Sequence, residues 1–296
     1  MIKRDTVSNT RPTAPTRVPV HDITGCEPTY TLDTHGFQLV RRRTRVQQFD
    51  TEAGIRKAYY PECEDLYRDM YVPCSRPISP HHICPLSHEH HEGRMLLIAR
   101  VCSTGASQVH IFGHLVRRGP SHWHALGTGN ALKKGPLHRV HVDQSYDGAE
   151  LVLRKHFPEL AASILDGQGK TRKCRWAILN LWRPLETVLK DPLAVASAVS
   201  IKDAQLVEAN VLYTRQPPPF NVNKTWSVLP SGEHEWYYKN EMRTDEVWVI
   251  KCFDSLEQNG VSRRTPHCAF VDEERSGEGF KDRESVEVRA VCVWDD

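Results

Sequence analysis

Many short β-rich runs, with only a few helical stretches between them, constrain the fold of this chain more than any other feature. The runs span residues 95–101, 108–116, 137–143, 176–182, 206–214, 225–229, 235–238, 246–253 and 285–294. Strands that do not alternate regularly with helices are typical of a sheet sandwich or barrel. We therefore expect a mainly β fold with flanking helices. A nucleotide-binding doubly wound sheet fits poorly, because the sequence has neither a GxGxxG nor a GxxxxGK(S/T) motif.

Three segments show helical character. Residues 51–70 place apolar side chains at helical spacing around Pro61, which predicts two short helices on the outside of a sheet. Residues 148–165 predict two more helices, with a break at Pro158. A further helix is expected over residues 185–197.

Composition excludes several classes of protein. The 296 residues include 39 Lys+Arg and 37 Asp+Glu, so the net charge of +2 lacks the basic field that a nucleic-acid binder needs. The mean hydropathy is −0.52 and no run of eighteen apolar residues occurs, which predicts no membrane span. The first thirty residues lack the apolar core of a secretory signal. We therefore expect a cytoplasmic protein.

Domain organisation follows from a change in composition near residue 35. Residues 1–34 are rich in Thr, Pro and Arg and lack periodicity, so we expect a flexible N-terminal arm. Residues 35–296 show no repeat or low-complexity linker and are expected to form a single domain, with two domains as the alternative. Nine cysteines without CxxC pairs predict reduced, mostly buried thiols.

The triplet His141-Val142-Asp143 is the most informative motif for chemistry. Alternate residues of a strand share a face, so the imidazole and the carboxylate would project together into a barrel. His267, far along the chain, is the candidate for a second imidazole. Two nitrogens and one oxygen leave three coordination positions open, which suits ferrous iron holding a 2-oxo acid and dioxygen. An HxD triplet alone is weak evidence, because it often arises by chance.

A polar stripe follows in residues 283–289. Arg283 and Ser285 share a strand face with Glu287 and Arg289, whereas the residues between them are apolar. A guanidinium is the group that the far carboxylate of 2-oxoglutarate requires. The stripe is therefore expected to line an active site, and either Arg283 or Arg289 could hold the cosubstrate.

These motifs belong to a longer pattern. The strings VHVDQSYDGAELVL, ILNLWRPLETVLKDPLAV, NKTWSVLPSGEHEWYY, MRTDEVWVIKCFDS, PHCAF and RESVEVRA occur in this order. The pattern resembles the fungal and bacterial hydroxylase/desaturase family that includes the AsaB-type enzymes, gibberellin desaturase and the cephamycin 7-hydroxylase component. The resemblance covers most of residues 50–294. It implies a non-haem Fe(II)/2-oxoglutarate-dependent dioxygenase with a double-stranded β-helix (jelly-roll or cupin-like) core.

The resemblance also implies roles for individual residues. It makes His141, Asp143 and His267 the iron ligands, Arg283 and Ser285 the clamp for the 2-oxoglutarate carboxylate, and Asn180 a further cosubstrate contact. Residues near these positions are candidate substrate contacts: Tyr146, Trp123, Trp182, Lys251 and Arg289. Two departures from the family pattern are Gly113, where an Asp is expected before His114, and Cys268, where a Thr commonly follows the distal histidine.

The expected reaction is hydroxylation, desaturation or oxidative rearrangement of a small natural product of terpenoid, polyketide or peptide origin. Two other functions stay open: a barrel that binds a small molecule without catalysis, and a zinc hydrolase that uses the histidine-rich stretch 81–91. The simpler interpretation of that stretch is a surface loop. The oligomeric state is also open, with a homodimer as one alternative.

Overall fold

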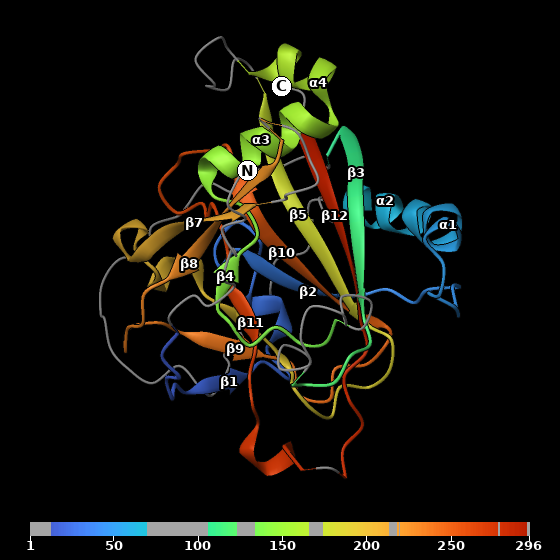
Figure 1. Ribbon diagram of the computed structural model, residues 1–296, viewed down its shortest axis with the longest axis vertical. Coiled ribbons are helices and arrows are strands. Elements are labelled where there is room, and N and C mark those ends of the chain that lie inside the picture. The colour runs from blue at the N-terminus through green and yellow to red at the C-terminus, as the bar shows by residue number, and fades with distance from the viewer. Residues whose placement is uncertain are drawn as a thin grey trace, which may run out of the picture.

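The computed structural model describes residues 13–69, 106–122, 134–165, 174–212, 218, 220–277 and 279–294. Within them, two facing sheets form the core, and helices cover one outer face and one end (Figure 1). The larger sheet has the order β1 (Val20–Asp22), β9 (Trp236–Tyr238), β6 (Leu193–Ala196), β11 (His267–Ala269), β4 (His141–Val142), β8 (Val222–Val228) and β7 (Leu206–Leu212). The smaller has the order β2 (Phe37–Arg41), β10 (Glu246–Asp254), β5 (Arg175–Pro184), β12 (Ser285–Trp294) and β3 (Gln108–Arg117).

The central strands of the smaller sheet are buried on both faces. Every residue of β10 is buried, and so are nearly all residues of β5 and β12. One face of the sheet is covered by helices and the other faces the larger sheet, so neither face needs to be polar (Figure 1). A sheet that is shielded from water on both sides provides a rigid wall on which a site can be built.

Helices α1 (Glu52–Gly54) and α2 (Tyr60–Asp69) are joined by a π-helical turn, Ile55–Tyr59, and cover the outer face of the smaller sheet. The break predicted at Pro61 is wrong. Pro61 is the second residue of α2, which directly follows the π-helical turn, and the helical residues continue through it from Glu52 to Asp69. The break predicted at Pro158 is confirmed, because α3 (Tyr146–His156) ends there and α4 (Pro158–Ile164) begins.

Two expectations from the sequence are corrected by the structure. Within the expected arm, β1 pairs in parallel with β9 and Ile23 is fully buried, so this part of the first 34 residues packs on the core. No helix forms over residues 185–197, all of which the structure describes, although one was expected there. Asp191 adopts a left-handed conformation (φ +50°) before Pro192, and the apolar residues that follow form β6. Its four consecutive apolar residues are all buried, so the hydrophobic pattern of the sequence could not distinguish a strand from a buried helix.

Most cysteines in the described residues are buried free thiols. Cys63, Cys252, Cys268 and Cys292 are buried free thiols, and burial raises the pKa of Cys63 and of Cys268 to about 12. Thiols with such a pKa are not reactive nucleophiles at neutral pH. Cys26 departs from the predicted reduced state, because it is disulfide-bonded.

None of the helices in the described ranges combines the length and the apolar character needed to cross a membrane.

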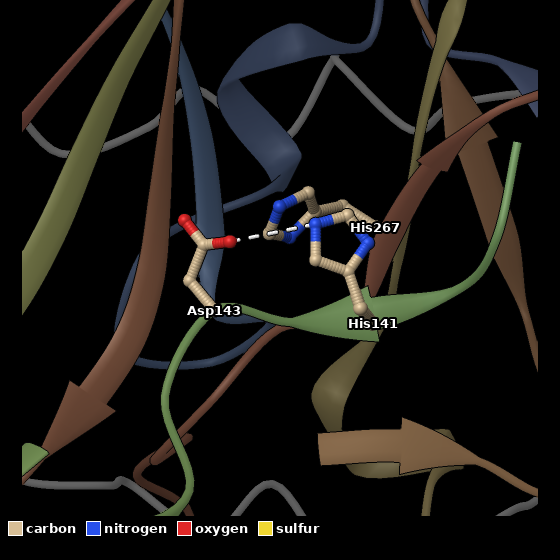
Figure 2. A group of neighbouring side chains, drawn as sticks. All are labelled: His141, Asp143 and His267. Atoms are coloured by element: carbon tan, nitrogen blue, oxygen red, sulfur yellow. Dashed lines mark ion pairs between the residues drawn. The ribbon is translucent and has the colours of Figure 1, made fainter. Parts of the chain in front are cut away.

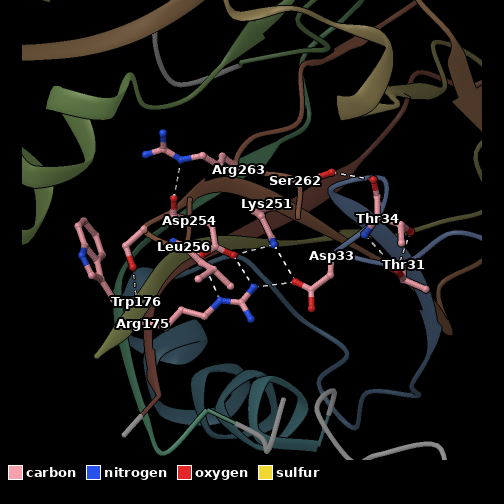
Figure 3. Close-up of polar contacts among 11 residues, drawn as sticks. Thr31, Asp33, Thr34, Arg175, Trp176, Lys251, Asp254, Leu256, Ser262 and Arg263 are labelled. Carbon is pink, nitrogen blue, oxygen red and sulfur yellow. Dashed lines mark hydrogen bonds and ion pairs between the residues drawn. The ribbon is translucent and has the colours of Figure 1, made fainter. Parts of the chain in front are cut away.

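A buried ion-pair network joins the segment before β2 to the smaller sheet (Figure 3). Lys251 Nζ lies 2.7 Å from Asp254 Oδ2 and 3.0 Å from Asp33 Oδ1. Arg175 Nη2 lies 2.6 Å from each of the same two carboxylates. The side chains of Lys251 and Asp254 are completely buried. Two cations and two anions thus neutralise each other in the interior, which is the condition under which buried charges are tolerated.

This network predicts a dependence of stability on pH. Burial alone would raise the pKa of Asp33, but Lys251 and Arg175 hold it below its usual range. A carboxylate with a lowered pKa stabilises the fold above its unfolded-state pKa, and this contribution is lost as the pH falls through its folded-state value. We expect the free energy of unfolding to fall below about pH 4, and to fall less steeply in an Asp33→Asn variant. Urea unfolding between pH 3 and pH 7 measures this; identical slopes in both proteins would contradict it.

Candidate active site

The HxD motif lies where β4 meets α3. His141 is in β4, Asp143 follows the strand directly, and Ser145 caps α3 by accepting a hydrogen bond from the Gly148 N–H at 3.1 Å. In the larger sheet β4 pairs with β11, and the register places His141 opposite His267. Two imidazoles separated by 126 positions in the sequence (267 − 141) therefore become neighbours, with a ring-centroid distance of 4.6 Å.

The three side chains point toward one another (Figure 2). His141, Asp143 and His267 each offer one ligand atom, and these atoms lie within 4.8 Å of one another. His141 Nε2 lies 3.4 Å from Asp143 Oδ1. Atoms that share one metal ion at about 2.1 Å lie about 3 to 4 Å apart, so the group needs only a small inward rotation to hold one.

Backbone carbonyls orient both imidazoles. His141 Nδ1 donates to Arg139 O at 2.9 Å, and His267 Nδ1 donates to Thr265 O at 3.0 Å. Each neutral ring then carries its lone pair on Nε2, which is the atom aimed at the centre of the group. These two carbonyls were not predicted from the sequence, although each lies two residues before its histidine.

Electrostatics favour the ligand forms of Asp143 and His267. Burial lowers the pKa of His267, and the neighbouring His141 lowers it further. Burial alone would raise the pKa of Asp143, but Arg289 and the two imidazoles hold it well below its usual range. Metal ligands must be deprotonated carboxylates and neutral imidazoles, and both pKa shifts are in the direction that favours these forms. Two nitrogens and one carboxylate oxygen form the donor set of the facial triad typical of non-haem iron.

Asn180 and Arg289 lie beside the group, on neighbouring strands. Asn180 Nδ2 donates to Asp143 Oδ2 at 2.8 Å, and Arg289 Nε lies 3.3 Å from the same oxygen. Arg289 is also paired with Glu287, whose Oε1 is 2.6 Å from Nη2. The structure therefore places Asn180 and Arg289 against Asp143.

Arg283 lies just before β12 and is buried. Its Nη1 donates to Asp191 O at 2.7 Å, its guanidinium lies 5.1 Å from the ring centre of Trp182, and its Nε is a buried donor with no partner among the described residues. Burial, together with the nearby Arg117, lowers the pKa of Arg283 to about 9, which leaves it charged at neutral pH. Ser285, also buried, begins β12 two residues later. Asp191 was not predicted from the sequence.

Other predicted site residues lie elsewhere. The Tyr146 hydroxyl donates to Asp203, and its ring packs under Arg263 in a surface crevice whose lining includes none of the three proposed ligands. Lys251 is occupied by the ion-pair network of Figure 3, which corrects its assignment as a substrate contact. Trp182 is buried beneath Arg283. Trp123 and the histidine-rich stretch 81–91 lie outside the described residues.

Comparison with known proteins identifies the family of the chain. The family model described as "Oxidoreductase/YMDC permease-like domain" matches residues 2–75 and 93–293. The hydroxylase/desaturase efuI of Hormonema carpetanum is 32% identical, over 100% of this chain and 90% of its own length. The alpha-ketoglutarate-dependent dioxygenase phiK of a fungal species is 29% identical, over 90% of this chain and 80% of its own length.

A solved structure supports the fold. The iron and alpha-ketoglutarate-dependent endoperoxidase NvfI superposes with a TM-score of 0.71 at 23% identity, covering 97% of this chain and 93% of that one. This likeness confirms the predicted double-stranded β-helix, and the relatives confirm the predicted family resemblance. The chain belongs to this oxidoreductase family of hydroxylases, desaturases and 2-oxoglutarate-dependent dioxygenases.

Proposed function

We propose that His141, Asp143 and His267 bind one ferrous ion, and that the chain uses 2-oxoglutarate and molecular oxygen to oxidise a small natural product. The observation that carries the proposal is the convergence of two free Nε2 atoms and one carboxylate oxygen within 4.8 Å. Bound iron and 2-oxoglutarate would supply the redox chemistry that activates dioxygen, which amino-acid side chains alone cannot perform. The chain contributes the ligands, their orientation and a buried surrounding that limits access of water.

The names of the relatives support a small-molecule oxidation. They describe a hydroxylase/desaturase, an alpha-ketoglutarate-dependent dioxygenase and a gibberellin cluster desaturase. Hydroxylation, desaturation and rearrangement of a terpenoid, polyketide or peptide-derived compound are therefore the proposed outcomes. A cytoplasmic location and a homodimer stay predictions of the sequence.

Arg283, not Arg289, is the proposed anchor for the far carboxylate of 2-oxoglutarate. Arg289 already lies between Asp143 and Glu287, so its charge is neutralised. Arg283 donates to a backbone carbonyl, that of Asp191, and no acidic side chain pairs with it in the described part of the chain. A buried guanidinium without an anion is costly, and a bound carboxylate removes that cost. Ser285 adds a hydroxyl from the start of β12.

Replacing Arg283 with Gln is expected to raise the KM for 2-oxoglutarate about 10- to 100-fold, because a hydrogen bond to a charged group contributes about 1.5–3 kcal/mol. Initial rates of succinate release at varied 2-oxoglutarate measure the effect. The exposed Arg41, replaced in the same way, is the control and should leave the KM unchanged. An unchanged KM in Arg283→Gln, or a rise confined to an Arg289 variant, would show that the wrong guanidinium had been chosen.

Anaerobic addition of ferrous iron and 2-oxoglutarate tests the proposal as a whole. We expect a weak visible charge-transfer band from the chelated complex, followed by succinate release when oxygen and candidate substrates are added. A binding barrel without catalysis would give no succinate with any substrate. A zinc hydrolase would purify with stoichiometric zinc, and iron would not restore its activity.

A further inference from the structure

We propose that Asn180 and Arg289, supported by Glu287, are positioning residues that restrain Asp143 so that only one of its oxygens is free to bind the metal. The inference rests on the proposed function and deepens it. It assigns to Asn180 and Arg289 a role different from the cosubstrate and substrate contacts expected from the sequence.

The register of two strands brings the positioning residues together. In the smaller sheet β5 and β12 are antiparallel neighbours, and Asn180 lies directly opposite Arg289. Residues that face each other across an antiparallel pair project from the same side of the sheet. Asn180 is fully buried. Both side chains extend toward the end of β4, where Asp143 lies.

Both contacts fall on the same carboxylate oxygen. Asn180 Nδ2 donates to Asp143 Oδ2 at 2.8 Å, and Arg289 Nε lies 3.3 Å from Oδ2. The other oxygen, Oδ1, is the one that lies 3.4 Å from His141 Nε2. The Asn180 hydrogen bond and the Arg289 charge therefore both act on Oδ2. Oδ1 stays turned toward the imidazoles (Figure 2).

Arg289 is itself held in place. Glu287 lies two residues earlier in β12, on the same face, and its Oε1 accepts a hydrogen bond from Arg289 Nε at 2.7 Å and lies 2.6 Å from Nη2. Burial alone would lower the pKa of Arg289, but Glu287 and Asp143 raise it, so the guanidinium stays charged. A guanidinium fixed between two carboxylates keeps its direction better than a free one.

The restraint matters because the proposed reaction uses every coordination position. A facial triad fills three positions of an octahedral ion and leaves three open, which a chelating keto acid and dioxygen would fill. If Asp143 bound through both oxygens, it would take one of those open positions. The hydrogen bond from Asn180 and the ion pair with Arg289, both at Oδ2, oppose that binding mode and also fix the direction of Oδ1.

Cobalt(II) titration of the full chain tests the inference without turnover. Asn180→Leu removes the amide donor while keeping similar volume. The double variant Arg289→Met/Glu287→Gln removes the guanidinium together with the charge of its partner Glu287. We expect the Co(II) dissociation constant to rise about 10- to 100-fold in each. The d–d absorption spectrum should also change, because it reports coordination number. Arg183→Gln is the matched control for losing a buried guanidinium, because Arg183 is buried and hydrogen-bonds to Tyr59 and to the Arg42 carbonyl. It should bind Co(II) as the wild type does.

The outcomes separate this inference from the proposed function. If the wild type does not bind one Co(II), the proposed function fails. If the wild type binds Co(II) and the variants match it in affinity and spectrum, the positioning role is overturned and the metal site stands. If Asn180→Leu fails to fold, Arg289→Lys gives the same comparison, because an ammonium keeps the charge but lacks the fork that reaches two carboxylates.

Discussion

The variants His141→Ala and Asp143→Ala are expected to lose turnover by about a thousand-fold or more while keeping the fold, because the bound metal carries the chemistry. Each removes one of three converging ligand atoms. Neither side chain is a large part of the apolar core, so the loss should not come from unfolding. Succinate release at saturating iron and 2-oxoglutarate measures turnover, and circular dichroism reports the fold.

His156→Ala is the control for losing a histidine. This residue is exposed at the end of α3 and should leave turnover unchanged. Normal succinate release from either ligand variant would mean that the metal binds elsewhere.

Removing Asp254 is expected to produce the largest loss of stability, about 3–5 kcal/mol in the free energy of unfolding. In an Asp254→Ala variant, the completely buried Lys251 loses a partner at 2.7 Å and Arg175 loses two contacts, at 2.6 Å and 3.1 Å (Figure 3). An uncompensated cation in the interior is costly, whereas the intact network is neutral. Urea unfolding at neutral pH measures the change.

A surface pair supplies the control for this variant. Glu52 and Arg56 form an exposed pair one helical turn apart, so Glu52→Ala should change stability little. The variant Lys251→Met tests the functional side of the same network. It should lower stability yet leave the KM for the small-molecule substrate unchanged, because Lys251 contacts Asp33 and Asp254. A higher KM in Lys251→Met with unchanged stability would restore Lys251 as a substrate contact.

Four strands of the smaller sheet, β3, β5, β10 and β12, could be predicted because their sequences leave little choice, whereas β2 was not predicted. The run at 285–294 coincides with β12, and polar and apolar residues alternate over 285–290 in the way that a strand with one functional face requires. Local patterns failed where a tertiary contact decides the outcome. Val20–Asp22 form a strand only because β9 is there to pair with them, and Leu193–Ala196 avoid a helix because both of their neighbours in the sheet are strands.

The candidate site divides in the same way. His141 and Asp143 are close in sequence, so their common direction could be inferred from local geometry. His267 could be named only as a candidate, since nothing local shows that β11 pairs with β4. The contacts of Asn180 and Arg289 with Asp143 depend on the register between β5 and β12. This register places Asn180 opposite Arg289, which is 109 positions later in the sequence (289 − 180). Residue types therefore indicated the chemistry. The proposed division of roles between Arg283 and Arg289 could be made only from their contacts in the folded chain.

Anomalous diffraction at the iron edge, from crystals of the full chain grown with ferrous iron without oxygen, would locate the metal directly. We expect one strong peak bonded to His141 Nε2, Asp143 Oδ1 and His267 Nε2. A peak at other side chains, such as the histidine-rich stretch 81–91, or no peak between these three residues would contradict the proposed metal site.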